Sequence, residues 1–127
     1  MPEKIPIKLE YIIRSSVPVL FNMISTPGGL SRWFADDVNI KNNMFFFIWN
    51  GSEDSARLIE KKMNKHIRLQ WDDDAGSDCY FEFRLKTQPL TGDVALVITD
   101  YCEPEEEEET NRLWEAQISK LKQVLGC

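Results

Sequence analysis

The sequence predicts an α+β fold, a curved antiparallel sheet of about seven strands with two short helices after the first strand and a long C-terminal helix. Three observations predict it. Apolar residues alternate along the first segment, the later strands follow one another without a crossover helix, and an apolar stripe at helical spacing closes the chain. The length of 127 residues is usual for one core, so we expect residues 1–127 to form a single domain.

The first strand and the first helix can be located from local signals. Alternation with a period of two marks Ile5–Arg14 as a strand with one buried face. Ser15 or Ser16 can then cap a short helix, and the stretch 26–29, TPGG, ends it. A second short helix follows, with apolar residues at helical spacing: Leu30, Trp33 and Phe34.

Tight turns separate the remaining strands, which are expected at Val38–Lys41, Met44–Trp49, Ala56–Met63, His66–Trp71, Cys79–Lys86 and Val94–Cys102. A four-residue loop at 89–92 would set Leu85 opposite Leu96 and Phe83 opposite Ile98 in the last hairpin. The same register continues to Phe81 opposite Asp100 and Cys79 opposite Cys102. It places Asp100 among apolar neighbours, where its carboxylate costs desolvation energy unless it is paired or lies near the rim of the sheet.

The chain ends in an amphipathic helix. The acidic run Glu105–Glu109 leads into it, and carboxylates near its start complement the helix dipole. Its apolar stripe at steps of four, three and four consists of Trp114, Ile118, Leu121 and Leu125. Gly126 is expected to end the helix, and the stripe is expected to pack on the concave face of the sheet.

Composition excludes several functions. The net charge of −6 argues against nucleic acid as a partner, because phosphate binding needs a clustered basic surface. No apolar run approaches the ~20 residues that span a bilayer, and the start of the chain lacks a secretion signal, so we expect a cytoplasmic protein without membrane insertion. Three widely spaced cysteines suit reduced thiols: Cys79, Cys102 and Cys127.

The order of elements, together with TPGGLSRWFADDV at 26–38 and NRLWEAQISKLKQVLG at 111–126, resembles the START/Bet v 1-like (SRPBCC) superfamily and its helix-grip fold. The two segments are similar to those of the branch related to activators of a heat-shock chaperone ATPase. The resemblance implies a sheet that curls around the last helix and leaves a cavity, which many relatives use for an apolar ligand. These motifs are packing residues, so they identify the family and not a substrate.

On this resemblance we expect a non-catalytic domain that binds a small apolar or lipid-like ligand between sheet and C-terminal helix, without a cofactor. Asp100, Tyr11 or Tyr101 would be the polar anchor. The alternative is that the many large rings fill the cavity themselves. The residues expected to line the cavity are Tyr11, Trp33, Phe47, Trp71, Phe81, Phe83, Ile98, Asp100, Trp114, Ile118 and Leu121.

Catalysis is the third interpretation, after ligand binding and protein interaction. An enzyme like the aromatase/cyclase relatives would need convergent polar groups in an open cavity. His66 is the only histidine, and its place beside the turn at 64–65 favours an exposed side chain over a buried base. Asp72–Asp74 lacks the spacing of a calcium loop and is interpreted as a solvated turn.

An interaction module, such as a chaperone-ATPase-activator-like cofactor without a ligand, is the second interpretation. The strand 44–49, MFFFIW, is apolar on both faces, although a strand covered on one side should be polar on the other. Large exposed apolar patches are uncommon on monomers. We therefore expect a homodimer or a partner protein to cover the outer face formed by Met44, Phe46 and Ile48, and the alternative is a locally coiled sheet.

Overall fold

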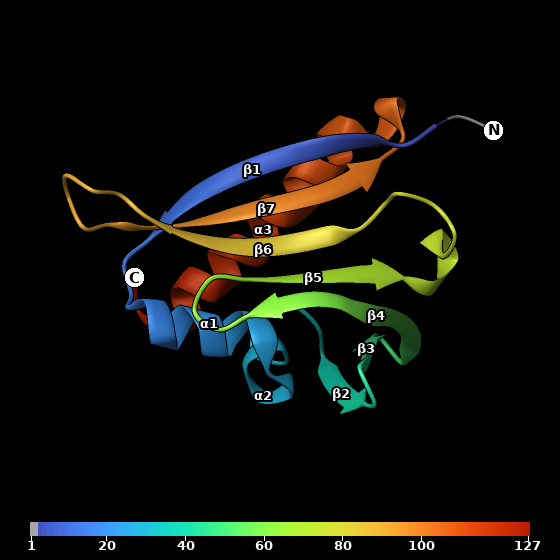
Figure 1. Cartoon of the computed structure of the whole chain (residues 1–127), viewed down its shortest axis with the longest axis horizontal. Coiled ribbons are helices and arrows are strands. Elements are labelled where there is room, and N and C mark those ends of the chain that lie inside the picture. The colour runs from blue at the N-terminus through green and yellow to red at the C-terminus, as the bar shows by residue number, and fades with distance from the viewer. Residues whose placement is uncertain (1–2) are drawn as a thin grey trace.

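The computed structural model describes residues 3–127, which form one seven-stranded antiparallel sheet with two short helices and one long helix (Figure 1). The strands are β1 (Ile5–Ile13), β2 (Asp37–Lys41), β3 (Met44–Trp49), β4 (Ser52–Lys62), β5 (His66–Trp71), β6 (Phe81–Thr87) and β7 (Val94–Cys102). The helices are α1 (Val17–Ser25), α2 (Pro27–Leu30) and α3 (Glu107–Leu125), with 3-10 turns η1 (Asp72–Asp74) and η2 (Pro104–Glu106). The predicted helix-grip fold is confirmed.

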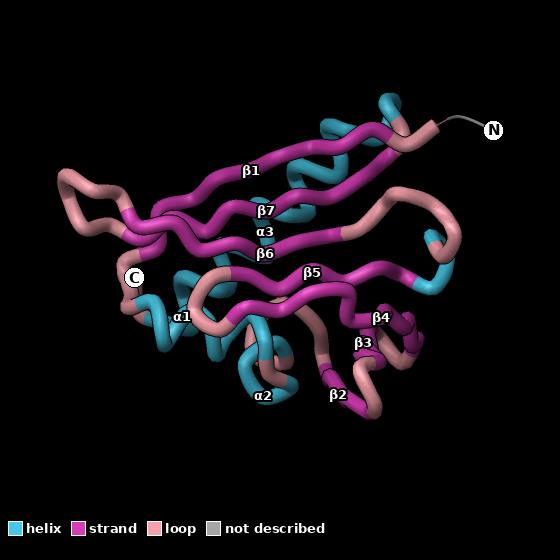
Figure 2. Tube along the Cα trace, viewed as in Figure 1, coloured by secondary structure: helices cyan, strands magenta, loops and turns pink. Residues whose placement is uncertain are grey.

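The sheet order is β1-β7-β6-β5-β4-β3-β2, and every neighbouring pair is antiparallel. The N-terminal strand β1 therefore pairs with the last strand, while β2 forms the opposite edge (Figure 2). In the same view α3 runs behind β6 and β7, and α1 and α2 lie at one end of the sheet. One face of the sheet is thus covered by helices, and the other faces the viewer.

Thr26 joins the two short helices. Its backbone N–H closes α1 on the carbonyl of Asn22, and its hydroxyl accepts a hydrogen bond of 2.9 Å from the backbone N–H of Gly29. The stretch that was predicted only to end the first helix therefore also begins the second, which starts at Pro27. Proline suits this position because the first helical N–H has no partner in the helix.

Asparagine turns set the bounds of the strands around β3. Asn42 and Asn43 have φ values of 50° and 66°, and Asn50 and Gly51 have 49° and 82°. Consecutive residues with positive φ match the twist of a hairpin, and asparagine and glycine adopt them at low cost.

Strands Met44–Trp49, His66–Trp71 and Val94–Cys102 have the predicted bounds.

The predicted register of the last hairpin is confirmed in its central part, where Leu85 pairs with Leu96 and Phe83 pairs with Ile98. The backbone N–H of Gln88 donates to the carbonyl of Asp93 at 2.8 Å, which leaves the predicted four residues as the loop. All four paired side chains belong to the apolar side of the sheet, so this hairpin contributes to the core.

The start of β6 differs from the prediction. The pairing of β6 with β7 ends at Glu82 opposite Thr99, and the strand begins at Phe81 instead of Cys79. The reason is local: the Gln70 side chain donates to the Cys79 carbonyl at 2.9 Å, and the Ser77 hydroxyl accepts from the Cys79 N–H at 3.1 Å. These bonds hold residue 79 in a loop, so the expected Cys79–Cys102 pair does not form, and all three cysteines are free thiols.

Helix α3 packs through the predicted stripe, of which Trp114, Ile118 and Leu121 are buried. Gly126 ends it in the left-handed conformation at φ 76°, as expected. Within residues 3–127, none of the helices has the length and apolar character needed to cross a membrane.

Candidate functional site

Aromatic side chains fill the space directly beneath α3. The Trp114 ring lies 5.8 Å from the Phe34 ring and 5.7 Å from the Phe83 ring, measured between centroids. Phe34 also contacts Phe47 at 5.1 Å and Phe81 at 6.1 Å. Stacked and edge-to-face contacts of this kind pack an interior closely. The open space next to these rings therefore lies beside α3 and not under it.

An open groove of about 300 Å³ runs along one flank of α3, and we call it the flank groove. It is lined by Phe34, Trp49, Trp71, Asp100, Thr110, Leu113, Trp114, Ala116 and Gln117. A second hollow of about 280 Å³ shares four of these residues and continues toward Trp33 and Lys120. Small-molecule pockets usually measure ~300–1,000 Å³, so the groove and its continuation have room for a small ligand.

The carbonyl oxygen of Phe34 forms hydrogen bonds with two other segments that line the groove, β3 and α3. It accepts a hydrogen bond of 2.8 Å from the indole N–H of Trp49, at the end of β3. It accepts another of 3.1 Å from the side-chain amide of Gln117, on α3. Both lone pairs of this buried carbonyl are thus used. The segment after α2, strand β3 and helix α3 are held at fixed separation, which keeps the groove open between them.

Asp100 is the one titratable side chain among the residues that line the flank groove. One carboxylate oxygen accepts from the indole N–H of Trp114 at 2.9 Å, and the other accepts from the backbone N–H of Tyr101 at 2.8 Å. Burial raises the pKa of Asp100, and the two hydrogen bonds only partly oppose that rise. The groove therefore contains a carboxylate whose charge is costly in its surroundings.

The structure distributes the predicted cavity residues among four places. Three line the flank groove: Trp71, Asp100 and Trp114. Trp33 lines the adjoining hollow. Two lie on the opposite flank of α3, in a hollow of about 590 Å³: Tyr11 and Ile118. The other five are buried in the core: Phe47, Phe81, Phe83, Ile98 and Leu121.

Sequence reasoning missed part of the groove wall. Trp49 continues the inward alternation of Phe45 and Phe47 along β3, so its position on the groove side could have been predicted. Leu113 is 62% exposed, and its neighbour Trp114 on the helical stripe is buried. An exposed leucine beside the buried stripe is a weak signal of an apolar surface at the edge of the helix. Ala116 and Gln117 carried no such signal.

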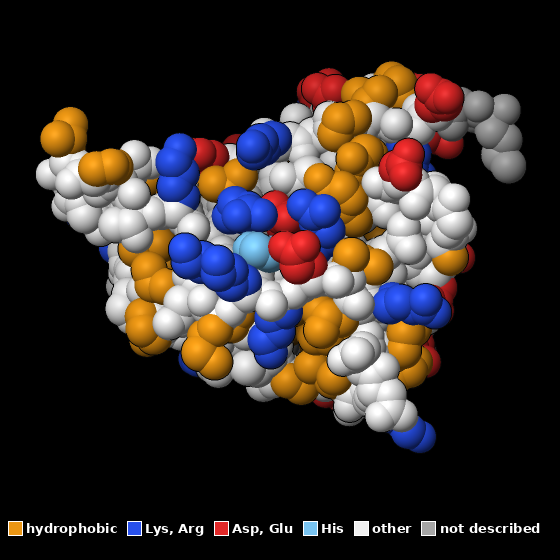
Figure 3. All heavy atoms as spheres, in the orientation of Figure 1, with side chains coloured by type: hydrophobic (Ala, Val, Ile, Leu, Met, Phe, Trp, Pro, Cys, Tyr) orange, Lys and Arg blue, Asp and Glu red, His pale blue; other side chains and the backbone are white. Residues whose placement is uncertain are grey.

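The sheet face opposite α3 carries a charged cluster (Figure 3). His66 is only 5% exposed there, so the expectation of an exposed histidine was wrong. It lies opposite Arg84 in the ladder, and its imidazole is hydrogen-bonded to Glu60. Glu82 is also 5% exposed and is held by Arg68 at 2.9 Å and by Arg84 at 3.2 Å. His66 thus belongs to a network on the far side of the sheet from the flank groove.

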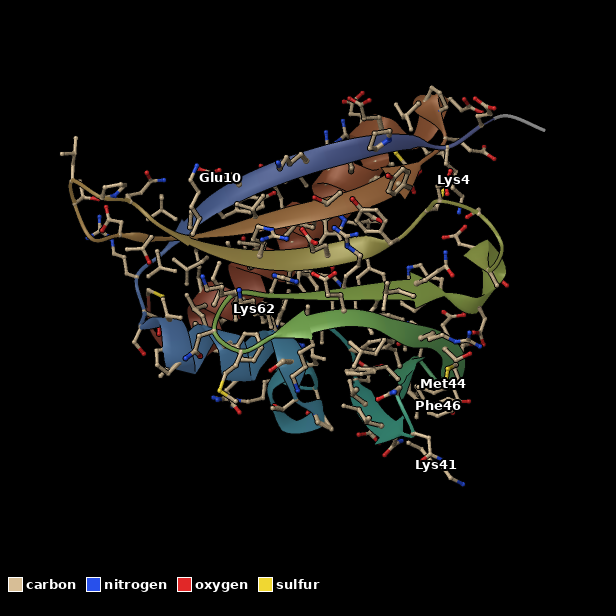
Figure 4. The ribbon with its side chains drawn as sticks, viewed as in Figure 1. Lys4, Glu10, Lys41, Met44, Phe46 and Lys62 are labelled. Atoms are coloured by element: carbon tan, nitrogen blue, oxygen red, sulfur yellow. The ribbon has the colours of Figure 1, made fainter. Side chains whose placement is uncertain are left out.

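The outer side of β3 is less exposed than its sequence suggests. Met44, Phe46 and Ile48 are each half-buried. Figure 4 labels Met44 and Phe46 on β3, with Lys41 of β2 nearby. Polar residues of β2 and β4 lie opposite them in the ladder, and Lys41 and Arg57 flank Met44. Long polar side chains can cover part of an apolar surface with their stems. The three apolar side chains form a narrow row between polar neighbours.

Residues 1–127 match the family model of the START-like superfamily domain. A search of curated proteins finds no match. Among solved structures, the solution NMR structure of BfR322 from Bacteroides fragilis is 36% identical, with a TM-score of 0.69, and the match covers 98% of this chain and 93% of that chain.

Two structures of lower identity share the fold. The Aha1 dimer from Colwellia psychrerythraea is 18% identical, with a TM-score of 0.80 and coverage of 95% of this chain and 96% of that chain. DynU16, a protein of the dynemicin biosynthetic locus, is 12% identical, with a TM-score of 0.80 and coverage of 95% of this chain and 47% of that chain. At these identities the likeness concerns the fold alone.

Proposed function

The chain belongs to the START-like superfamily, and from this premise we propose that residues 1–127 act as one non-catalytic domain that binds a small apolar or lipid-like ligand in the flank groove. The observation that carries the proposal is the apolar groove beside α3, with tryptophan rings on its walls and a single carboxylate. Ligand pockets commonly combine an apolar lining with few polar groups that orient the ligand.

The size of the groove limits the ligand. About 300 Å³ in the flank groove and about 280 Å³ in the adjoining hollow suit a molecule of one to a few rings or a short acyl chain. The aromatic core beneath α3 leaves the ligand on the flank of the helix, partly in contact with water. We therefore propose a ligand that is released easily and not one that is sealed inside the fold.

The groove can be blocked at Ala116. This residue is exposed on α3 and lines both the flank groove and the adjoining hollow. Ala116→Trp would place an indole in the shared volume without touching the buried stripe. Ala116 also borders the hollow on the opposite flank of α3. Ser119 is likewise exposed on α3 and lines that hollow but not the flank groove, so Ser119→Trp is the matched control for an indole on the opposite flank.

Binding of the neutral fluorescent probe N-phenylnaphthylamine tests the proposal. Ala116→Trp should raise its Kd by about tenfold or more, while Ser119→Trp should leave it nearly unchanged. If both variants lose affinity for the probe equally, or if the unmodified protein does not bind it, the flank groove is not the binding site. Native mass spectrometry of protein purified from its own cells would show whether a natural ligand accompanies it.

The lining of the groove supports a non-catalytic role. Acid–base catalysis usually pairs two titratable groups with separated pKa values, and among the described residues that line the flank groove Asp100 is alone. Both of its oxygens already accept hydrogen bonds. An aromatase/cyclase-type reaction is therefore the least supported function. The absence of a cofactor and a cytoplasmic location stay predictions from the sequence.

A second candidate function is association through the outer side of β3, with a second copy or with a partner such as a chaperone ATPase. The row of Met44, Phe46 and Ile48 favours it, and a structural neighbour, Aha1 from Colwellia psychrerythraea, is a dimer. Analytical ultracentrifugation should show a dimer that Phe46→Lys dissociates and the loop variant Leu90→Lys does not. A monomer at all concentrations, with no chaperone captured from its own cells, would remove this candidate.

A further inference from the structure

Three tryptophans share the lining of the flank groove with Asp100, the one carboxylate among the described residues that line it. Trp49 and Trp71 lie 6.1 Å apart between ring centroids, and both are half-buried. Trp114 supplies the hydrogen bond to Asp100, and its ring stacks near Phe34 at 5.8 Å. The faces of such rings carry negative electrostatic potential and attract cations, with tryptophan the strongest of them. The groove thus combines two features that stabilise positive charge.

Asp100 lacks a bonded counter-ion in the described part of the chain. Its two hydrogen bonds come from neutral N–H groups, those of Trp114 and Tyr101. The ammonium of Lys4 lies within electrostatic range, but it is bound to Asp74 at 2.8 Å. Burial raises the pKa of Asp100, so a positive charge brought to its carboxylate would remove an existing cost.

The surface around this end of the groove is also acidic. Trp71 is followed directly by the exposed Asp72 and Asp73 of η1. The run Glu105–Glu109 leads into α3, whose first half forms one wall. Exposed charges are screened by salt beyond ~10 Å, so these carboxylates act on a ligand that approaches the groove, while Asp100 supplies the negative charge inside it. A ligand carboxylate would be repelled at this site, and a ligand cation would be attracted.

We propose that the flank groove selects an organic cation, a protonated amine whose ammonium binds Asp100 while its apolar or aromatic body lies on Trp49 and Trp71. The inference rests on the proposed ligand-binding function and narrows its ligand class. Under this proposal the groove prefers amines to fatty acids and other apolar anions, although all of these would fit it by size.

Three probes with the same ring system and different charge test the inference by isothermal titration calorimetry at neutral pH. Naphthylmethylamine is cationic, naphthylmethanol is neutral, and naphthoic acid is anionic. We expect the amine to bind about tenfold more tightly than the alcohol, and the acid to bind most weakly. Asp100→Asn should lower the affinity for the amine about tenfold and change that for the alcohol much less.

Asp73→Asn is the control, because Asp73 is an exposed carboxylate next to the groove that does not line it. It should change the affinity for the amine less than about threefold. An amine that binds no better than the alcohol or the acid would overturn the cation inference and leave the groove in place. Failure of all three probes to bind would overturn the proposed function itself. The comparison of probes on unmodified protein needs no variant, so it holds even if Asp100→Asn folds poorly.

Discussion

Replacing Gly29 by alanine should destabilise the corner that positions the groove. A Cβ on Gly29 would lie 2.1 Å from the carbonyl oxygen of Asn22 and 2.6 Å from the Cα of Met23. Non-bonded heavy atoms rest at about 3.5–4.0 Å, so α1 would have to move away by roughly 1 Å or more. Both contacts are to backbone, which cannot rotate aside as a side chain can.

Overpacking of a well-filled core costs typically about 1–3 kcal/mol, and we expect about 3 kcal/mol or more here because a whole helix must shift. That is a large part of the ~5–15 kcal/mol that stabilises a domain. Gly28→Ala is the matched control, since an added Cβ at that exposed position meets nothing within 4 Å. It should leave the protein equally stable or stabilise it by up to about 1 kcal/mol.

Urea unfolding followed by tryptophan fluorescence measures both variants. If the free energy of unfolding of Gly29→Ala stays within about 0.5 kcal/mol of that of the unmodified protein, α2 does not approach α1 as closely as the structure shows. The same variant should weaken probe binding in the flank groove, because the corner carries Phe34, whose carbonyl holds Trp49 and Gln117. If the variant is destabilised but binds the probe as well as the unmodified protein, the corner does not control the shape of the groove.

Three further predictions concern burial and charge. Leu121→Ala should cost about 2–5 kcal/mol in urea unfolding because Leu121 is 0% exposed, whereas Leu90→Ala, at 99% exposed, should cost nearly nothing; similar costs would refute the packing of α3. Burial raises the pKa of Asp100 above 3.8, so the folded state binds its proton more tightly than the unfolded state does. The stability advantage over Asp100→Asn should therefore be largest below that pH and shrink as the pH rises through the raised pKa; an advantage that grows would contradict this. Burial alone would raise the pKa of Glu82, but the hydrogen bonds from Arg84 and Arg68 bring it below 4.5. The Glu82 carboxylate therefore contributes to the free energy of unfolding above pH 4.5, and this contribution is lost as the pH falls through the lowered pKa. Glu82→Gln should cost about 1–3 kcal/mol in urea unfolding at neutral pH and little in acid. A cost that does not depend on pH would argue against the ion pairs.

Most of the fold could be predicted because its signals are local. The alternation along β1, the asparagine pair at 42–43 and the stripe through Trp114 and Leu121 each depend on neighbours within a few residues. The bounds of β6 could not be predicted in this way. They depend on the Gln70 side chain, which captures the Cys79 carbonyl from another segment.

The site was harder to predict because it depends on how distant segments meet. Trp71, Asp100 and Trp114 line the flank groove, but whether a ring lines a groove or fills a core depends on the position of α3 over the sheet. The burial of His66 likewise depends on its cross-strand neighbours, which a turn at 64–65 does not reveal.

The tryptophan indole signals in a proton–nitrogen NMR spectrum test the central claim most directly, since the chain has 4 tryptophans. On titration with naphthylmethylamine, the N–H signals of Trp49, Trp71 and Trp114 should shift, because these residues line the flank groove. The signal of Trp33 should shift least, because Trp33 lines only the adjoining hollow, is 2% exposed and donates its N–H to the Met23 carbonyl at 2.9 Å. A shift confined to Trp33, or none at all, would contradict a ligand site on the flank of α3.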